Sequence, residues 1–253
     1  MAVGDYRKGC VQLSRLERLE SLDDFEKWVH QPQRWLGVFD LPFGLPRELV
    51  VQLGWPDTWP ELMRYYAGLD RQDIRNTFAA FCNARAVGKK FAHRAVDKLA
   101  GSSPSMKWVN PPVAFMLHAG VPRLMNAGVH LPGLHNGDTT RVAVEGYPGL
   151  LAREILGQRS YKNDNKSKQT PDRLIARKDL ITALELGQTR LNIQLKLTHA
   201  QRDTLIDDAK GDSLDAVLCM LQAAWAKIQQ EQGALQYGLP ACIDPLEGWI
   251  ITA

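Results

Sequence analysis

VFDLPFGLP, residues 38–46, places a bare carboxylate at the end of an apolar run. Residues 35–39 have the character of a short buried strand that ends at Asp40, and the chain then turns through Pro42, Gly44 and Pro46. Burying a carboxylate is unfavourable unless it meets a cation or several hydrogen-bond donors. Two interpretations stay open from these residues alone: Asp40 accepts backbone N–H groups of the turn, or it is a metal ligand.

The composition is that of a folded globular protein. With 253 residues, 45% of them hydrophobic and 23% charged, the chain lies near the average for such proteins and is long enough to bury a substantial core. Disordered and collagen-like classes are therefore excluded, and we expect a single domain over residues 1–253. The net charge of +3 permits a nucleic-acid partner without requiring one.

The cysteines and the apolar runs indicate a cellular setting. Cys10, Cys82, Cys219 and Cys242 form no CxxC pair, so a zinc ribbon or a redox pair is not indicated and a reducing compartment is favoured. No apolar run has the length of a membrane span, and the first ten residues lack the apolar core of a signal peptide. We therefore expect a soluble, cytoplasmic protein without a membrane partner.

Hydrophobic spacing predicts an α/β protein. Strands are expected at residues 35–40 and 141–147, with a weaker one at 10–19 and an extended segment at 247–253. Helices are expected at residues 21–30, 148–156, 171–186 and 212–229. Residues 47–130 are helical in pattern almost throughout, which favours a large helical insertion within an α/β domain.

Four acids have sequence settings that indicate burial. They are Asp40, Glu145 within VAVEGYP (142–148), and Asp212 and Asp215 at the start of an apolar helix. Carboxylates that converge on one point repel one another, and a divalent cation removes that repulsion. Oxygen ligands of this kind suit Mg²⁺ or Mn²⁺ better than zinc. All four are candidate metal ligands, and Asp40, Glu145 and Asp215 are the candidate catalytic residues.

Each of these acids also has a purely structural interpretation. Glu145 could pair with an arginine such as Arg141 or Arg153. Asp212 could cap the helix that begins there, with Asp215 three residues on as the acid of a capping-box-like start. The spacing of these residues does not show that the four carboxylates meet.

Basic residues gather in ARAVGKKFAHRAVDK (84–98) and in the loop at 161–170. Arg85, Arg94 and Lys162 are candidate contacts for phosphate oxygens, the alternative being a solvated surface. The chain has no HExxH, GxSxG, GxGxxG or GxxxxGK[ST] pattern. Zinc peptidases, serine hydrolases, dinucleotide-binding proteins and P-loop proteins are therefore not indicated.

Four segments carry a resemblance to a known family. They are FDLPFGLP (39–46), VEGYPGLLAREILGQRSYK (144–162), GDSLDAVLCMLQAAWA (211–226) and DPLEGWI (244–250). In this order they resemble the DUF429 family, a group of predicted nucleases with an RNase H-like fold. The resemblance implies a mixed sheet flanked by helices, with Asp40 and Glu145 on core strands and Asp212 and Asp215 on a late helix. It also implies two-metal phosphodiester hydrolysis with Mg²⁺ or Mn²⁺, with Lys162 and Arg173 on the phosphate side.

The beginning of the chain departs from this family pattern. Members of the family begin with a strand that ends in an aspartate, and MAVGDYRKGC resembles the exit of such a strand, in which Asp5 is more like a hairpin residue than the expected acid. Two explanations remain: a start codon placed too far downstream, or the loss of one metal ligand.

Our leading hypothesis from the sequence is a metal-dependent nuclease or phosphodiesterase of RNase H-like α/β fold. The alternative is a non-catalytic protein that keeps this fold and binds nucleic acid or another partner. An ATP-using relative is a third possibility, because actin-like ATPases share the core sheet, but the chain has no phosphate-loop pattern.

Overall fold

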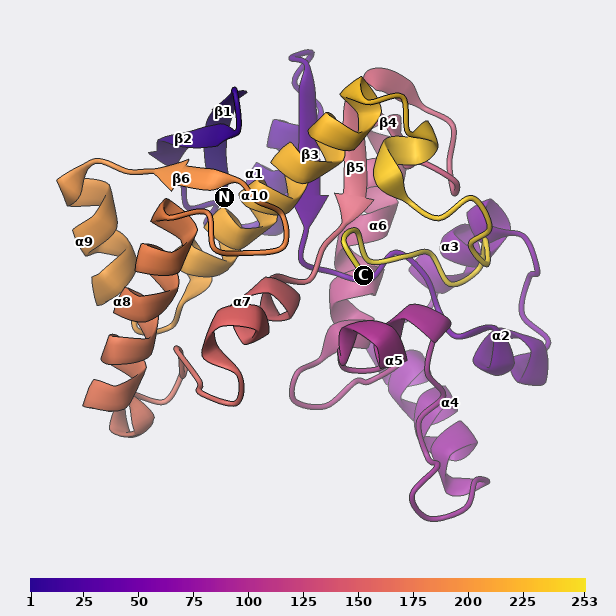
Figure 1. Ribbon diagram of the computed structural model, residues 1–253. Helices are drawn as coiled ribbons and strands as arrows, with labels where there is room; N and C mark the ends of the chain where they lie inside the picture. Colours follow the sequence, from indigo (N-terminus) through magenta and orange to yellow (C-terminus); the bar gives the residue numbers. More distant parts are fainter.

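Six strands form two separate three-stranded sheets in the computed structural model, which describes residues 1–253 (Figure 1). One sheet contains β1 (Ala2–Arg7), β2 (Cys10–Leu16) and β6 (Gln194–Lys196), and the other contains β3 (Trp35–Phe39), β4 (Val129–His130) and β5 (Asp138–Glu145). Helices flank both sheets. The predicted mixed α/β class is confirmed, and the RNase H-like arrangement remains a prediction.

The two sheets differ in the direction of their strands. The first has the order β1-β2-β6, with β1 antiparallel to β2 across the turn at Lys8 and Gly9, and β6 parallel to β2. The second has the order β3-β5-β4 and is entirely parallel. Phe39 lies opposite Glu145 in its register, so Asp40 and Glu145 come at the same edge, where the carboxyl ends of β3 and β5 meet.

Ten α-helices surround the sheets, and one of them joins the two halves of the molecule. They are α1 (Leu22–Val29), α2 (Arg47–Leu53), α3 (Trp59–Ala67), α4 (Arg71–Asn83), α5 (Ala95–Ala100), α6 (Val113–Asn126), α7 (Pro148–Leu156), α8 (Pro171–Glu185), α9 (His199–Asp207) and α10 (Asp212–Glu231), with 3₁₀ turns η1 (Lys166–Lys168) and η2 (Leu235–Gly238). Helix α10 packs against β3 of one sheet and against β1 and β2 of the other (Figure 1). It forms this bridge because apolar residues occupy most of its circumference.

The hydrophobic core is correspondingly divided in two. One large cluster lies among α2, α3, α4, α6 and the parallel sheet, and the other lies among α7, α8, α10 and the β1-β2-β6 sheet. None of the helices combines the length and the apolar character that a membrane crossing requires.

Most predicted elements are present close to their expected positions. Ser21 caps α1 by accepting a hydrogen bond from the backbone N–H of Asp24, as the Ser-Leu-Asp-Asp start indicates. Residues 247–253, expected to be extended, contribute only an isolated bridge between Glu145 and Ile250. Residues 47–126 do hold five helices, α2 to α6, but their description as an insertion stays a prediction.

Candidate functional site

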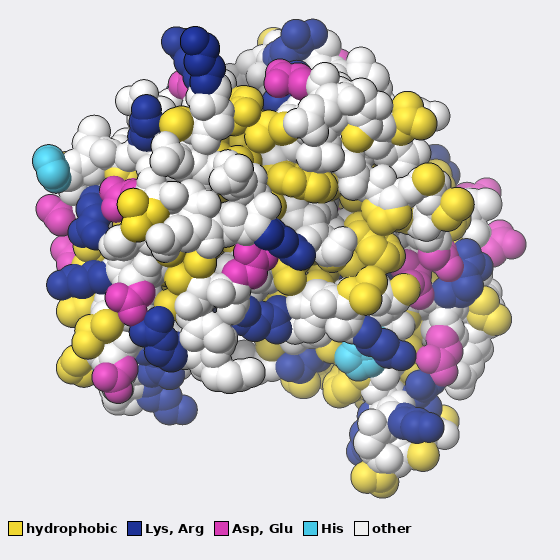
Figure 2. Space-filling view, viewed as in Figure 1, with side chains coloured by type: hydrophobic (Ala, Val, Ile, Leu, Met, Phe, Trp, Pro, Cys, Tyr) yellow, Lys and Arg dark blue, Asp and Glu magenta, His cyan; other side chains and the backbone are white.

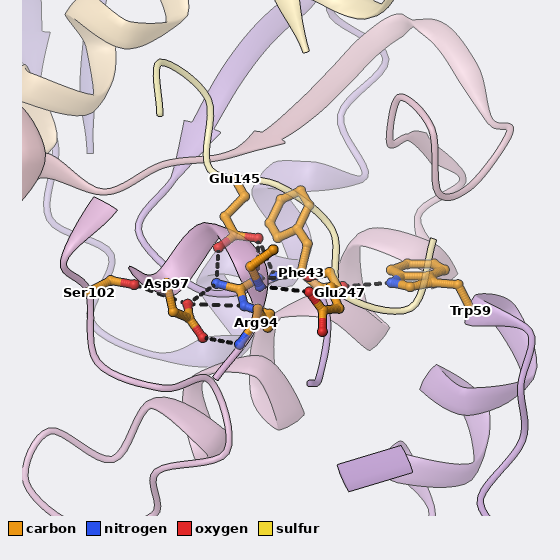
Figure 3. A network of polar contacts seen from close by, with 8 residues as sticks. Phe43, Trp59, Arg94, Asp97, Ser102, Glu145 and Glu247 are labelled. Carbon is orange, nitrogen blue, oxygen red and sulfur yellow. Dashed lines mark hydrogen bonds and ion pairs between the residues drawn. The ribbon is translucent and has the colours of Figure 1, made fainter. Parts of the chain in front are cut away.

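Glu145 is the centre of a buried ion-pair network, not of a carboxylate cluster (Figure 3). Its two carboxylate oxygens accept hydrogen bonds from the two terminal nitrogens of Arg94 at 2.6 and 2.8 Å, and Oε2 also accepts from the backbone N–H of Phe43 at 2.9 Å. Arg94 donates further bonds to Asp97 at 2.8 and 3.1 Å. The three charged residues are only 1–3% exposed.

This network fixes the charges of its members. Burial alone would lower the pKa of the Arg94 guanidinium, but Glu145 and Asp97 outweigh that effect and raise it. Burial raises the pKa of the Glu145 carboxyl, and Arg94 opposes the rise. The paired hydrogen bonds and the Phe43 N–H all require acceptor oxygens, so we assign Glu145 as ionised.

Two expectations are corrected by this arrangement. Glu145 pairs with neither Arg141 nor Arg153: Arg141 binds Asp138, and Arg153 binds the carbonyls that end α5. Arg94 is buried against Glu145, so it is not a surface contact for phosphate. The opposite charges of Arg94 and Glu145 compensate each other, because neither side chain reaches water at this depth.

The stretch that follows Asp40 is a buried connection, not a surface turn. Residues 42–46 are all buried, and they pack against residues 244–248 near the end of the chain. Leu45 donates its backbone N–H to Leu246 at 3.0 Å, and Trp59 donates its indole N–H to the carbonyl of Phe43 at 2.6 Å. The Pro-Phe-Gly-Leu-Pro run thus brings β3, Glu145 and the carboxyl-terminal segment together.

A second group of polar side chains lies where β3 ends and α10 begins. Asp215, on the first turn of α10, accepts hydrogen bonds from the hydroxyl of Tyr161 and the ammonium of Lys162. Asp40 follows β3 and lies near enough to both Asp215 and Lys162 for their charges to shift its pKa. The thiol of Cys219, one turn further along α10, is buried beside the same carboxylates. We call Asp40, Asp215, Lys162 and Tyr161 the Asp40 site.

Asp40 is the least satisfied carboxylate of this site. Burial, together with the negative charge of Asp215, raises its pKa to about 7, although Lys162 opposes this. Lys162 pairs with Asp215 and acts on Asp40 only at longer range. Asp40 retains accessible surface because a cavity opens beside it, yet the surrounding protein excludes enough water to disfavour its charge.

The charge of Asp215, unlike that of Asp40, is compensated by a cationic neighbour, Lys162. Burial raises the pKa of Asp215, while Lys162 and Tyr161 lower it by binding the ionised form. Burial also lowers the pKa of the Lys162 ammonium, but Asp215 outweighs this effect and raises it. The Lys162 side chain is 40% exposed and that of Asp215 only 12%. Lys162 therefore lies at the border between solvent and the buried acid.

Asp212 does not cap α10, contrary to one interpretation of the sequence. The N-cap position is taken by Gly211, and the side chain of Asp208 accepts hydrogen bonds from the backbone N–H groups of Gly211 and Ser213. Asp212 is exposed in the first turn of α10 and lines the same cavity as Asp40. The sequence pattern does not identify Asp208 as the residue that binds these backbone N–H groups, because Asp208 lies before the helix begins.

The remaining basic candidates lie apart from the Asp40 site. Arg85 pairs with Glu48 of α2 and covers the ring of Phe81, and Arg173 donates to the carbonyl of Lys168. Neither residue lines the cavity beside Asp40. On the face seen in Figure 2, basic and acidic side chains are intermixed and form no continuous basic band. Surface charge on this face therefore does not single out a nucleic-acid groove.

The Asp40 site supplies only part of a ligand set for a divalent cation. No three His, Cys, Asp or Glu side chains are grouped closely enough to hold a metal ion, so the four-carboxylate centre expected from the sequence is not assembled. Asp40 and Asp215 remain near one another, and one or two carboxylates are a common protein contribution to a Mg²⁺ site. Glu145 does not fit, since Arg94 occupies both of its oxygens.

Comparison with protein families, with curated proteins and with solved structures gives no match to this chain. The resemblance to the DUF429 family is therefore neither supported nor contradicted. Sequence reasoning missed Asp97 and Tyr161, and it also missed Glu247, whose backbone carbonyl accepts a hydrogen bond from Arg94 at 2.8 Å. Tyr161 and Glu247 lie in the segments that carry the resemblance, which is the sequence signal that points to them.

Proposed function

We propose that the chain is a metal-dependent phosphodiester hydrolase whose reaction centre is the Asp40 site. The observation that carries the proposal is that Asp40 and Asp215, which are far apart in the sequence, lie near one another where β3 ends and α10 begins, with Lys162 beside them. This is the position at which α/β proteins commonly hold their reacting groups, outside the carboxyl ends of parallel strands.

Asp40 and Asp215 would hold one divalent cation, Mg²⁺ or Mn²⁺. Such a cation would polarise a phosphate oxygen and offset the negative charge that develops on it. Asp215 would have to exchange the ammonium of Lys162 for the cation, and Lys162 would then be free to bind a phosphate oxygen. Tyr161 would keep Asp215 oriented through its hydroxyl. The second cation of a two-metal mechanism has no ligand set here, because Glu145 is occupied.

The alternative is a non-catalytic protein that binds nucleic acid or another partner. It is favoured by one observation: Lys162 already neutralises Asp215, and Arg94 already neutralises Glu145, so of the three candidate catalytic acids only Asp40 lacks a cationic partner. Assays with single-stranded, duplex and structured nucleic acids, with and without Mn²⁺, separate the two. Cleavage that depends on Mn²⁺ supports the hydrolase, and binding without cleavage supports the alternative.

We expect Asp40→Asn to abolish the response to divalent cations. At a Mn²⁺ concentration about 100 times the Kd, binding stabilises a folded protein by about 2.7 kcal/mol, which is roughly 5–10 °C in Tm for a chain of this size. Differential scanning fluorimetry of the wild type should show this shift, and Asp40→Asn should lose it together with Mn²⁺-dependent cleavage. Asp179→Asn is the matched control, because Asp179 pairs with Arg159 on the exposed side of α8. An equal shift in Asp40→Asn would remove Asp40 from the cation site.

Without a cation, the stability of the protein should fall as the pH rises from about 4 to 7. The pKa of Asp40 is near 7 in the folded chain and near 3.8 in the unfolded chain. The folded state therefore binds more protons in this window, and raising the pH favours unfolding. Because Asp40 is partly open to solvent, we expect a loss of only about 1 kcal/mol.

Urea denaturation at pH 4.5, 6 and 8 in EDTA measures this effect. Asp40→Asn should be as stable as the wild type at pH 4.5 and more stable at pH 8. A difference between the two proteins that stays constant with pH would show that the carboxyl of Asp40 does not titrate in this range.

A further inference from the structure

The two sheets present facing edges to a common cavity of about 910 Å³. Strand β1 is one of the two outer strands of its sheet, β3 is one of the two outer strands of the other, and both line this cavity. Helix α10 forms a further wall through small residues that include Ala216, Cys219 and Ala223. We call this cavity the inter-sheet slot. In Figure 1 no strand lies between β1 and β3.

Both strands direct unpaired backbone groups into the slot. The carbonyl of Phe39 accepts a hydrogen bond from Gly146 at 2.8 Å, so Phe39 faces β5, and alternation then turns the backbone groups of Leu36 and Val38 away from β5. Met1 exchanges two backbone hydrogen bonds with Glu17, at 2.7 and 2.9 Å, so Ala2 faces away from β2. An exposed edge of this kind is a template for another strand.

The slot is mainly apolar, although Asp5, Arg34, Lys227 and Glu231 also line it, and it is acidic at the end where β3 finishes. Phe25, Trp28 and Met220 are among its apolar wall residues, and the indole N–H groups of Trp28 and Trp35 have no hydrogen-bond acceptor. Asp40, Asp212 and Asp215 lie together at the end where β3 finishes, and of these only Asp215 has a cationic partner. An occupant that suits this surface is extended, apolar along its length, and positively charged where it reaches Asp40.

The relative direction of β1 and β3 allows one strand to pair with both. The amino group of Met1 and the carboxylate of Asp40 each lie close enough to Cys219 to shift the pKa of its thiol. Strand β1 therefore begins beside the end at which β3 finishes. A strand placed between them would run antiparallel to one edge and parallel to the other, which are both regular pairings. Five or six residues, roughly 17–20 Å, would match the two edges.

We propose that the inter-sheet slot binds one extended polypeptide segment of a partner protein, which adds a strand between β1 and β3 and places a lysine or arginine beside Asp40. The bound strand would join the two sheets into one. Its backbone would supply the affinity through the open edges, and its basic residue would fix its position at the acidic end. Because that residue would compete with a divalent cation for Asp40, the test is made in EDTA. It is then independent of the proposed hydrolysis.

Blocked heptapeptides of alternating valine and alanine, with lysine or with glutamate at both ends, are suitable probes. We expect the lysine peptide to bind at least tenfold more tightly than the glutamate peptide, measured by tryptophan fluorescence. Under saturation, hydrogen exchange should slow at the amides of Ala2, Leu36 and Val38. Failure of the lysine peptide to protect these amides would overturn the proposal.

A slot-filling variant tests the location. Ala223→Phe puts a ring into the slot from α10 and should weaken binding at least tenfold, whereas Ala200→Phe, on the exposed face of α9, should not. Equal binding by both variants would place the peptide elsewhere. Fusing the lysine peptide ahead of Met1 gives a further comparison. Protection by the fused strand alone, with none from the free peptide, would overturn the assignment to a separate partner.

Discussion

Replacing Arg94 by methionine should lower the free energy of unfolding by about 3–5 kcal/mol, the largest effect that we expect from any single substitution in this chain. Arg94 is 2% exposed, and it is the only cation that contacts Glu145 and Asp97. Methionine fills a similar volume but leaves two buried carboxylates without a cationic partner. They must then take up protons or admit water, and either outcome costs most of that energy. Urea denaturation at pH 7 measures the change.

Arg47→Met is the matched control for this prediction. Arg47 also pairs with a carboxylate, that of Asp244, but its side chain is 45% exposed, so we expect a loss of at most about 1 kcal/mol. Adding Glu145→Gln to Arg94→Met should recover part of the lost stability, because one of the two orphaned charges is removed. A loss below 1 kcal/mol for Arg94→Met would contradict the role that we assign to the network.

The strands and helices of the core could be predicted because local pattern determines them. Residues 35–39 and 142–144 are apolar within one strand each, and α10 is mainly apolar from residue 214 to 228, about four turns. Strand β1 could not be predicted in this way. Its six residues, AVGDYR, alternate poorly, and their pairing with β2 depends on the tight turn at Lys8 and Gly9.

The roles of the acidic residues cannot be decided from the sequence alone. Asp40 and Glu145 have nearly the same setting, since each ends a parallel core strand, and from sequence each could equally be a ligand. The structure separates them because Arg94 reaches Glu145 from α5, in a helical region that local pattern does not place. A carboxylate's partner is determined by tertiary contacts between distant segments. Patterns of hydrophobicity carry little information on such contacts.

Two further features of the site depend on tertiary contacts that sequence patterns do not show. The ammonium of Lys162 binds Asp215, a contact that the sequence does not predict, and its expected place on the phosphate side stays a prediction. The separation of the strands into two sheets, with a slot between their facing edges, is a second feature that local patterns do not predict. That slot keeps Asp40 accessible and leaves it without the partner that Glu145 has.

Gly44→Ala should destabilise the protein by about 3 kcal/mol, although the side chain gains only a methyl group. A Cβ atom at Gly44 would lie 2.3 Å from the carbonyl oxygen of Leu246 and 2.5 Å from the carbonyl carbon of Glu247. These are backbone atoms, so the connection after Asp40 and the carboxyl-terminal segment would have to separate. The hydrogen bond from Leu45 to Leu246 would be lost with them.

The loss of stability should exceed the cost of fitting one methyl group, because Glu247 also holds the starts of two helices, α2 and α5. Its carboxylate accepts hydrogen bonds from the backbone N–H groups of Arg47 and Ala95, and its carbonyl accepts one from Arg94. Gly68→Ala is the control, since Gly68 has ordinary helical dihedral angles and its nearest contact is 3.4 Å, and we expect a change within about 0.5 kcal/mol. Thermal unfolding of both variants measures the difference. If Gly44→Ala retained wild-type stability, the segment after Asp40 would be loosely packed, and the site could not depend on it for position.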